Sequence, residues 1–342
     1  MKISNILTRR NFETWHFWQV VYEWEDIFSR EFGASLKPLS PFKDRFSKYV
    51  FNRYLPTNYL WRLHQNLKSS MSLVFLMSPL QGRYFAMDRQ KTVIPIIIDF
   101  WKHHIKFFLR NYSSAKIIIL TSFEVIDFLQ GIYHELGGKH PELLYLPLSV
   151  SDKWFTNDAP SKSIDIIQIG RKNPLLHEWA LKLTEEFPKI EYVFQKNING
   201  VLHYQSTRNG LMGSFNDRKS YMKLLSQCKV SLVSSPGMDN SRNTGGFNPV
   251  TPRFFESAVS YCFMVGRYPR NKDFAFCGVN KVCQIPNSYN EFRDLVLEGL
   301  NNGPSYYDSL RNFSKMHLTS VRAKELTELL NTALKTFLLG GE

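Results

Sequence analysis

The sequence has few cysteines and no long hydrophobic run. Its 342 residues include four cysteines, Cys228, Cys262, Cys277 and Cys283. Their spacing fits neither paired zinc ligands nor a dense disulfide framework, and no His/Cys cluster has metal-ligand spacing. The apolar stretches are far shorter than the ~20 residues that span a bilayer, and the first residues lack the apolar run of a secretory signal. We therefore expect a cytoplasmic protein, soluble or peripheral on the inner face of a membrane, with no metal site.

Acidic residues are fewer than basic ones, 30 against 43, which gives a formal net charge of +13. The excess is spread over both halves of the chain and forms no basic tail. Such a charge favours an anionic partner, which could be a nucleotide phosphate, an acidic membrane surface or a nucleic acid. The sequence contains no recognised RNA-binding or DNA-binding motif, so we expect no nucleic acid partner and keep that interpretation as the weaker alternative. No GxGxxG follows a predicted strand, which argues against an NAD-linked dehydrogenase.

Short apolar runs alternate with helical patterns in the first half of the chain. The predicted strands cover Ser72–Met77, Thr92–Ile98, Lys116–Leu120 and Leu143–Leu148. Between the last two, Ser122–Leu136 has apolar residues at helical spacing behind a serine that can cap the helix. This is a βαβ unit, so we predict an α/β fold with a buried parallel sheet.

A polar stretch at 149–163 predicts a domain boundary, and the same alternation then restarts. Strands are predicted at 164–169, 190–194 and 230–233, and helices at 174–187, 218–227 and 251–260. We expect two Rossmann-like domains, 1–150 and 151–316, facing across a cleft, and a C-terminal helix within 317–342 that packs back on the first domain. Open α/β sheets bind ligands at the carboxyl ends of their strands.

Gly170, Arg171 and Lys172 form the first candidate site, because they follow a predicted strand and precede a helix. A turn of this kind presents backbone N–H groups and the positive end of the helix dipole, and the two cations suit a diphosphate. The alternative is that Gly170 makes the turn and both cations are only solvated.

The second candidate is the Gly-rich and Asn-rich loop within Ser234–Phe255, about sixteen residues long. Loops of this length within compact domains are usually functional or disordered. Thr251 is a plausible N-cap before Pro252, Arg253 could neutralise a phosphate, and Glu256 could accept hydrogen bonds from vicinal sugar hydroxyls. The alternative is that Glu256 only stabilises the start of the helix.

These motifs together resemble a known family. The strand ending in Ile-Gly-Arg, the segment Arg218–Val230, the Gly/Asn-rich loop and Thr251–Ala258 are similar to the donor-binding domain of group 1 glycosyltransferases of the GT-B fold. The similarity is greatest to the bacterial branch of surface-polysaccharide gene clusters and its CgeB-like relatives. It covers about residues 143–275, while over residues 1–140 it is only architectural.

The resemblance implies a role for several residues. Arg171 resembles the arginine that contacts the donor diphosphate, with Lys172 as the nearby substitute for the family lysine. Glu256 resembles the second glutamate of the paired-Glu motif, which binds the ribose. Asn248 stands where the family has its first glutamate, so the strict motif is absent.

The implied reaction is a hexosyltransferase-like transfer from a nucleoside diphosphate sugar to a glycan or lipid-linked acceptor, without an essential metal or another cofactor. The sequence has no Asp-x-Asp triplet, in keeping with a metal-independent reaction. The resemblance favours retention of configuration, although a base at Asp99 would suit inversion, so both outcomes stay open. A non-catalytic GT-B protein that binds nucleotide sugars is the other main alternative.

Candidate acid or base residues follow the predicted strand at 92–98. Asp99 could act as a base, and His103 or His104 could hydrogen-bond the sugar or the phosphate. Adjacent histidines point in different directions, so we expect at most one of them to serve. Each could instead be structural, with Asp99 capping the next helix. Ser122 and Glu124 are candidates of lower rank.

An aromatic and basic segment near the N-terminus could contact a lipid-linked acceptor or an anionic membrane surface. It comprises Arg9, Arg10, Trp15, Phe17, Trp18, Tyr22 and Trp24. Trp and Tyr favour the membrane interface, and cations favour anionic head groups. The apolar residues fall on both sides of a helical wheel, which favours burial in the core as the main interpretation.

Overall fold

The computed structural model describes residues 2–339, apart from 16, 43–44, 47–48, 50–69, 82–91, 114, 216 and 240. The chain forms two compact units. The first comprises Met1–Leu148 with Thr319–Glu342, and the second comprises Ser149–Leu318.

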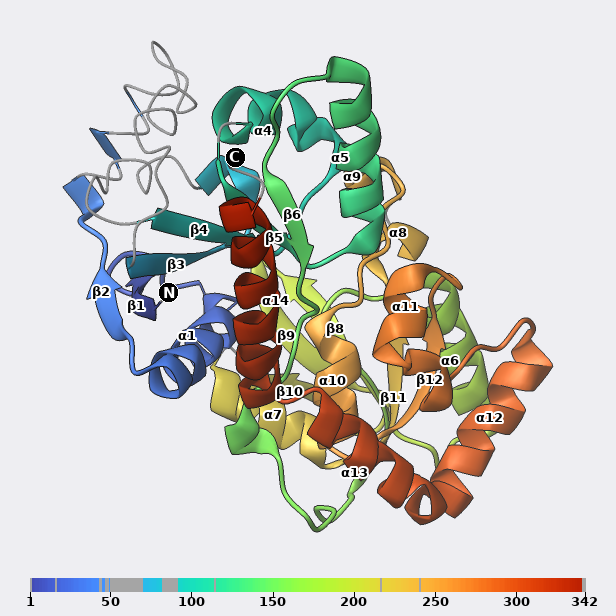
Figure 1. Cartoon of the computed structure of the whole chain (residues 1–342). Coiled ribbons are helices and arrows are strands. Elements are labelled where there is room, and N and C mark those ends of the chain that lie inside the picture. Colours follow the sequence, from blue (N-terminus) through green and yellow to red (C-terminus); the bar gives the residue numbers. More distant parts are fainter. Residues whose placement is uncertain are drawn as a thin grey trace. The chain divides into compact units, whose positions relative to one another are not determined.

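The first unit contains a six-stranded sheet with the strand order β2-β1-β3-β4-β5-β6 (Figure 1). All neighbouring strands pair in parallel. The strands are β1 (Lys2–Thr8), β2 (Ser35–Pro38), β3 (Ser70–Leu76), β4 (Thr92–Ile97), β5 (Ile117–Leu120) and β6 (Glu142–Tyr145). β3, β4 and β5 are buried almost throughout, as expected for parallel strands with both faces covered.

The helices of the first unit are α1 (Trp18–Phe32), α4 (Ile105–Tyr112), α5 (Phe123–Leu136) and α14 (Thr319–Leu339). Short 3-10 turns, η1 (Pro79–Gln81) and η3 (Lys102–His104), follow β3 and β4. α14 packs along α1 (Figure 1), which confirms that the C-terminal helix returns to the first unit.

The second unit contains a seven-stranded sheet with the order β10-β9-β8-β7-β11-β12-β13. β9 pairs antiparallel with both β8 and β10, whereas the other neighbours are parallel. The strands are β7 (Ile164–Gln168), β8 (Tyr192–Ile198), β9 (Val201–Ser206), β10 (Gly210–Gly213), β11 (Cys228–Ser234), β12 (Phe263–Arg267) and β13 (Cys283–Gln284).

The longer helices of this unit are α6 (Pro174–Glu186), α7 (Arg218–Ser226), α10 (Pro252–Val259), α12 (Tyr289–Asn302) and α13 (Tyr307–Met316), and α8 (Pro236–Asp239), α9 (Ser241–Thr244) and α11 (Lys272–Cys277) are short. The remaining turns are η4 (Asp152–Trp154), η5 (Val279–Lys281) and η6 (Gly303–Tyr306). α6 and α12 pack on one face of the sheet, where Ile166 of β7 lies. α7 packs on the other face with Ile164 and Ile167. The run Ile164–Ile169 is largely apolar because helices cover both sides of β7.

The predicted α/β fold is confirmed, and most predicted elements lie within a few residues of their observed bounds. Two details were wrong. The Ser122 side chain makes no cap hydrogen bond at the start of α5. The loop after β11 is not free of regular structure, because α8 and α9 lie within it. The four cysteines are buried thiols that form no disulfide with one another.

Candidate functional site

The candidate site lies at the carboxyl edge of the second sheet. β7, β11 and β12 are parallel neighbours, so the chain leaves all three strands at the same edge. After β7, Gly170 adopts φ 72°, a left-handed conformation that glycine tolerates without a side-chain clash. Asn173 then caps α6, its Oδ1 accepting the Leu176 N–H at 2.9 Å. We call residues 169–173 the Gly170 turn.

Two arginines from distant elements contact the Gly170 turn. Arg253, in the first turn of α10, donates from Nη1 to the carbonyl of Arg171 at 3.1 Å and more weakly to that of Ile169 at 3.4 Å. Arg267, at the end of β12, places Nη1 3.5 Å from Oδ1 of Asn173. Arg171 itself is exposed. Positive charge from the turn, from α10 and from β12 therefore lies at one place. Such a site favours an anion.

Lys172 is half-buried in the same turn. Its ammonium lies 3.3 Å from Nε2 of His177 and 4.9 Å from the centre of the Phe194 ring. Burial and the nearby charge of Lys196 lower the pKa of Lys172. The predicted cations Arg171, Lys172 and Arg253 are therefore brought together at one turn.

Glu256 is buried, with 2% of its surface exposed, and both carboxylate oxygens have partners on α7. Oε1 pairs with Nη1 of Arg218 at 2.7 Å, and Oε2 accepts the Tyr221 hydroxyl at 2.6 Å. Burial raises the pKa of Tyr221, and the charge of Glu256 adds to this rise. The Glu256 carboxylate thus joins α10 to α7.

Asn248 lies beside the end of β11. Its Oδ1 accepts a hydrogen bond from the Ser235 hydroxyl at 2.8 Å, and its Nδ2 donates to the Gly246 carbonyl at 2.7 Å. Thr251 occupies the N-cap position of α10, but its side chain makes no cap hydrogen bond. Its hydroxyl oxygen is buried without a partner in the described part of the chain. The predicted N-cap position is therefore confirmed, but the side chain does not cap the helix.

The candidate acid or base residues lie at the carboxyl edge of the first sheet. Asp99 follows β4, and its backbone N–H donates to the Met77 carbonyl at 2.9 Å. His104 is buried, and its Nδ1 accepts the backbone N–H of Trp101 at 3.2 Å. Burial and the neighbouring His103 lower the pKa of His104 to about 4. His103 is exposed, so the two histidines differ as expected of adjacent residues.

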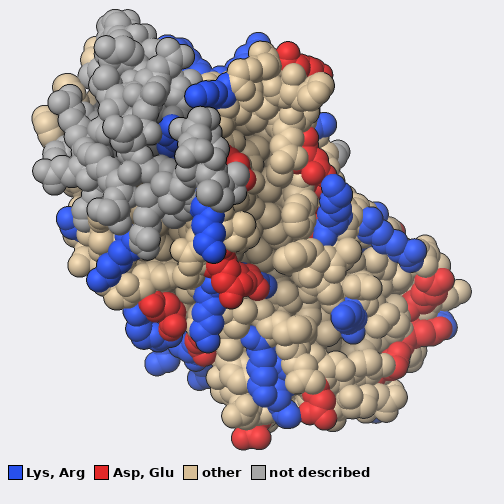
Figure 2. Space-filling view, viewed as in Figure 1, with Lys and Arg blue, Asp and Glu red and all other residues tan. Residues whose placement is uncertain are grey.

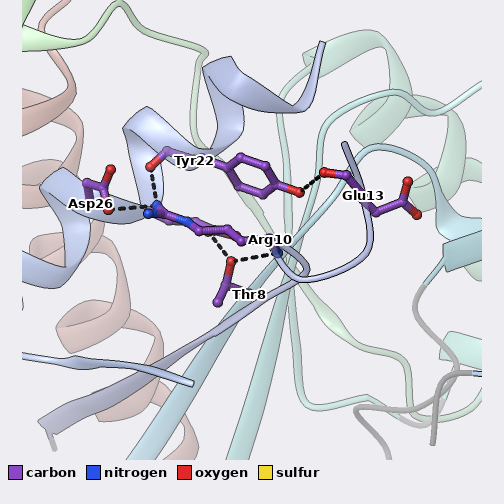
Figure 3. A network of polar contacts seen from close by, with 6 residues as sticks. Thr8, Arg10, Glu13, Tyr22 and Asp26 are labelled. Atoms are coloured by element: carbon purple, nitrogen blue, oxygen red, sulfur yellow. Dashed lines mark hydrogen bonds and ion pairs between the residues drawn. The ribbon is translucent and has the colours of Figure 1, made fainter. Parts of the chain in front are cut away.

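Arg10 is held in ion pairs and hydrogen bonds at the end of β1. Figure 3 shows its guanidinium between the Tyr22 carbonyl, 2.5 Å away, and the Asp26 carboxylate, 2.7 Å away. Arg10 Nε also lies 3.2 Å from Oε2 of Glu25, which accepts the Thr8 hydroxyl at 2.6 Å. Burial raises the pKa of Glu25 to about 7.

The aromatic segment around it is divided between core and surface. Arg9 is buried and pairs with Glu13 at 3.0 Å. Trp18 and Trp24 are also buried, whereas 69% of Trp15 and 53% of Phe17 are exposed. Burial in the core, the favoured sequence interpretation, is therefore correct for Trp18 and Trp24.

On the face shown in Figure 2, Lys and Arg side chains are scattered and interleaved with Asp and Glu rather than gathered in one basic patch. Within the described ranges, no helix combines the length and apolar character needed to cross a bilayer. Nor do the described His, Cys, Asp and Glu side chains form a group that could hold a metal ion.

Sequence reasoning missed several residues of this region. Arg267 ends a strand that was not predicted, although the apolar run before it was a usable signal. Arg218 and Tyr221 belong to a motif that was noticed only for its resemblance, and their contacts with Glu256 depend on how α7 and α10 pack. His177 was predicted only as part of the helix at 174–187, without a role in the site.

No family model matches the sequence, and no curated protein matches it either. Solved structures do match. Trehalose-6-phosphate synthase OtsA is 10% identical, with a TM-score of 0.61 over 96% of this chain and 99% of that one. A mutant of Staphylococcus aureus TarM, in a complex that includes UDP, is 12% identical, with a TM-score of 0.54 over 81% of this chain. The present chain spans 58% of the length of TarM.

A Listeria monocytogenes protein assigned as a UDP-N-acetylglucosamine 2-epimerase is 10% identical, with a TM-score of 0.54 over 99% of this chain and 98% of that one. At such low identity, these similarities establish the fold and not the reaction. The chain has the GT-B fold of two Rossmann-like domains that it shares with glycosyltransferases such as OtsA.

Proposed function

We propose that the protein is a glycosyltransferase that moves a sugar from a nucleoside diphosphate donor to a glycan or lipid-linked acceptor. The observation that carries this proposal is the convergence of Arg171, Lys172, Arg253 and Arg267 on the turn before α6. A diphosphate carries several negative charges and is the leaving group of the reaction. Preorganised cations beside it stabilise the negative charge that develops on the diphosphate as the bond between its oxygen and the anomeric carbon of the sugar breaks.

The second unit would bind the donor. Arg171 and Lys172 would contact the diphosphate, and Arg253 would hold the turn and contribute charge. Asn248 and Thr251 would offer polar groups to the sugar or the phosphate. Glu256 would bind the ribose only through lone pairs that Arg218 and Tyr221 leave available, because both oxygens already have a partner.

The acceptor would bind at the first unit. Asp99 is the candidate base for an inverting reaction, and His103 is the exposed imidazole beside it in sequence. His104 serves better as the buried cap of η3. The family resemblance in the sequence supports metal-independent transfer with retention, in bacterial surface-polysaccharide assembly. Contact with a lipid-linked acceptor or an anionic membrane would fall to the exposed Trp15 and Phe17.

Nucleotide binding is the first test. UDP, GDP, dTDP, ADP and CMP, each with and without Mg²⁺, should be compared by the thermal shift of the purified protein. A ligand that binds only the folded state raises its stability by RT ln(1 + [L]/Kd), so we expect one nucleoside diphosphate to give a selective, metal-independent shift.

Arg171→Ala tests the diphosphate contact. Loss of a charge-assisted hydrogen bond to a phosphate costs about 1–3 kcal/mol, so we expect roughly 5- to 150-fold weaker binding by calorimetry. Arg293→Ala, at a half-exposed position of α12, is the matched control and should bind as the wild type does. Equal affinity of the Arg171 variant would refute the assignment of the diphosphate site.

Turnover separates the proposed activity from its alternatives. A transferase releases the nucleoside diphosphate and transfers the sugar, whereas an epimerase changes the sugar of the donor without an acceptor. Binding without either reaction would indicate a non-catalytic GT-B protein. Filter binding of single-stranded nucleic acid with a steep salt dependence would favour the nucleic-acid alternative.

A further inference from the structure

Three side chains behind the Gly170 turn and Lys172 within the turn are joined by consecutive hydrogen bonds. Gln168 ends β7, Tyr192 begins β8, His177 lies on α6, and Lys172 belongs to the turn. The Tyr192 hydroxyl lies 2.9 Å from Oε1 of Gln168 and 2.9 Å from Nδ1 of His177. Nε2 of His177 lies 3.3 Å from the Lys172 ammonium. This series of hydrogen bonds leads from Gln168 on a buried strand to Lys172, a cation of the candidate donor site.

The direction of each hydrogen bond follows from its donors. The Tyr192 hydroxyl donates its single hydrogen to Gln168, so its oxygen accepts from Nδ1–H of His177. Nε2 of the neutral imidazole then carries a lone pair, and the Lys172 ammonium, which can only donate, fills it. Burial and the charge of Lys172 lower the pKa of His177 to about 4, in agreement with a neutral ring.

This arrangement lowers the stability of the folded protein. Nε2 of Gln168 is buried without a hydrogen-bond partner in the described part of the chain, and an unsatisfied buried donor is unfavourable. In return, Lys172 is held by His177 and by the face of the Phe194 ring. An ammonium has three N–H donors, so two of them are left for a ligand after the bond to His177.

We propose that His177 is a positioning residue which, held by Tyr192 and Gln168, orients the Lys172 ammonium toward the diphosphate of the donor. This inference rests on the proposed function. A free lysine side chain loses much rotamer freedom when it binds a ligand. Because His177 already orders the Lys172 side chain in the free protein, the loss of its rotamer entropy occurs when the protein folds and does not weaken ligand binding.

Two substitutions of His177 separate its contacts. The amide of His177→Gln overlays the position of Nε2 and can still accept from Lys172. The amide of His177→Asn overlays Nδ1, so it can reach Tyr192 but not Lys172. Both remove the ring, so damage to packing is similar in the two variants. The probes are UDP and inorganic pyrophosphate, measured by calorimetry, with thermal unfolding recorded in their absence.

We expect His177→Asn to weaken the binding of UDP and pyrophosphate about 3- to 30-fold, and His177→Gln to recover most of the affinity. We also expect His177→Asn to have no further effect in a Lys172→Ala background, because it acts through that lysine. Equal affinities for the two His177 variants, or an effect that persists without Lys172, would overturn the inference.

The outcomes distinguish this inference from the proposed function. If Lys172→Ala binds both probes like the wild type while Arg171→Ala does not, the role of His177 is refuted and the donor site stands. If the wild-type protein binds none of the nucleotides and no pyrophosphate, both proposals fail.

Discussion

Replacing Glu256 should lower the stability of the second unit, whatever role this residue has in binding. The carboxylate is 2% exposed and pairs with Arg218, whose side chain is 11% exposed. Glu256→Ala leaves that guanidinium buried without its anion and leaves the Tyr221 hydroxyl without its acceptor. Removing one partner of a buried ion pair typically costs about 3–5 kcal/mol. Glu256→Gln keeps an acceptor oxygen and should cost about 1–3 kcal/mol.

Urea denaturation measures this cost. Trp179 packs on the core cluster of the second unit, so its share of the fluorescence of the seven tryptophans changes when that unit unfolds. Glu178→Ala, at an exposed position of α6, is the matched control and should change the free energy of unfolding by no more than about 0.5 kcal/mol. If Glu256→Ala unfolds at the wild-type urea concentration, the ion pair does not support the fold, and the reasoning is refuted.

Two further predictions concern other parts of the chain. Burial raises the pKa of Glu25 to about 7, above the unfolded value of about 4.3, so its contribution to the stability of the first unit should fall between these two pH values. Glu25→Gln should remove that slope and stabilise the protein by about 1–3 kcal/mol at pH 8 in urea denaturation; an unchanged slope would exclude Glu25 as its source. Gly170→Ala should lower the free energy of unfolding by about 1–2 kcal/mol, because alanine is strained at a φ of 72°. The added Cβ would lie 3.6 Å from Arg253, which is an ordinary contact and adds no clash. A wild-type urea midpoint for this variant would show that the backbone conformation carries no strain.

Much of the fold could be predicted because its signals are local. The buried strands are apolar and rich in β-branched residues, and α6 begins with Asn173 and Pro174, an N-cap and a first helical residue. The N-terminal strand β1 was missed because the run Lys2–Thr8 mixes polar and apolar residues and was considered only as a possible secretory signal. The hairpin of β9 and β10 was missed because its residues are largely half-buried or exposed.

The candidate site was predicted in part for the same reason. Gly170 followed by Arg171 and Lys172 is a local pattern, since a turn between a strand and a helix needs only neighbouring residues. By itself, the sequence thus determined the α/β class, about half of the described strands and helices, and the basic turn before α6.

Only the tertiary structure decided which side chains meet there. Arg253 reaches the Arg171 carbonyl across 82 positions of sequence, and Glu256 is paired with Arg218 and Tyr221 rather than exposed. The same holds for the neighbours His103 and His104, of which packing buries one and exposes the other. The physical reason is that local propensities act through neighbouring backbone and side-chain contacts, whereas burial and ion pairing depend on how whole elements pack.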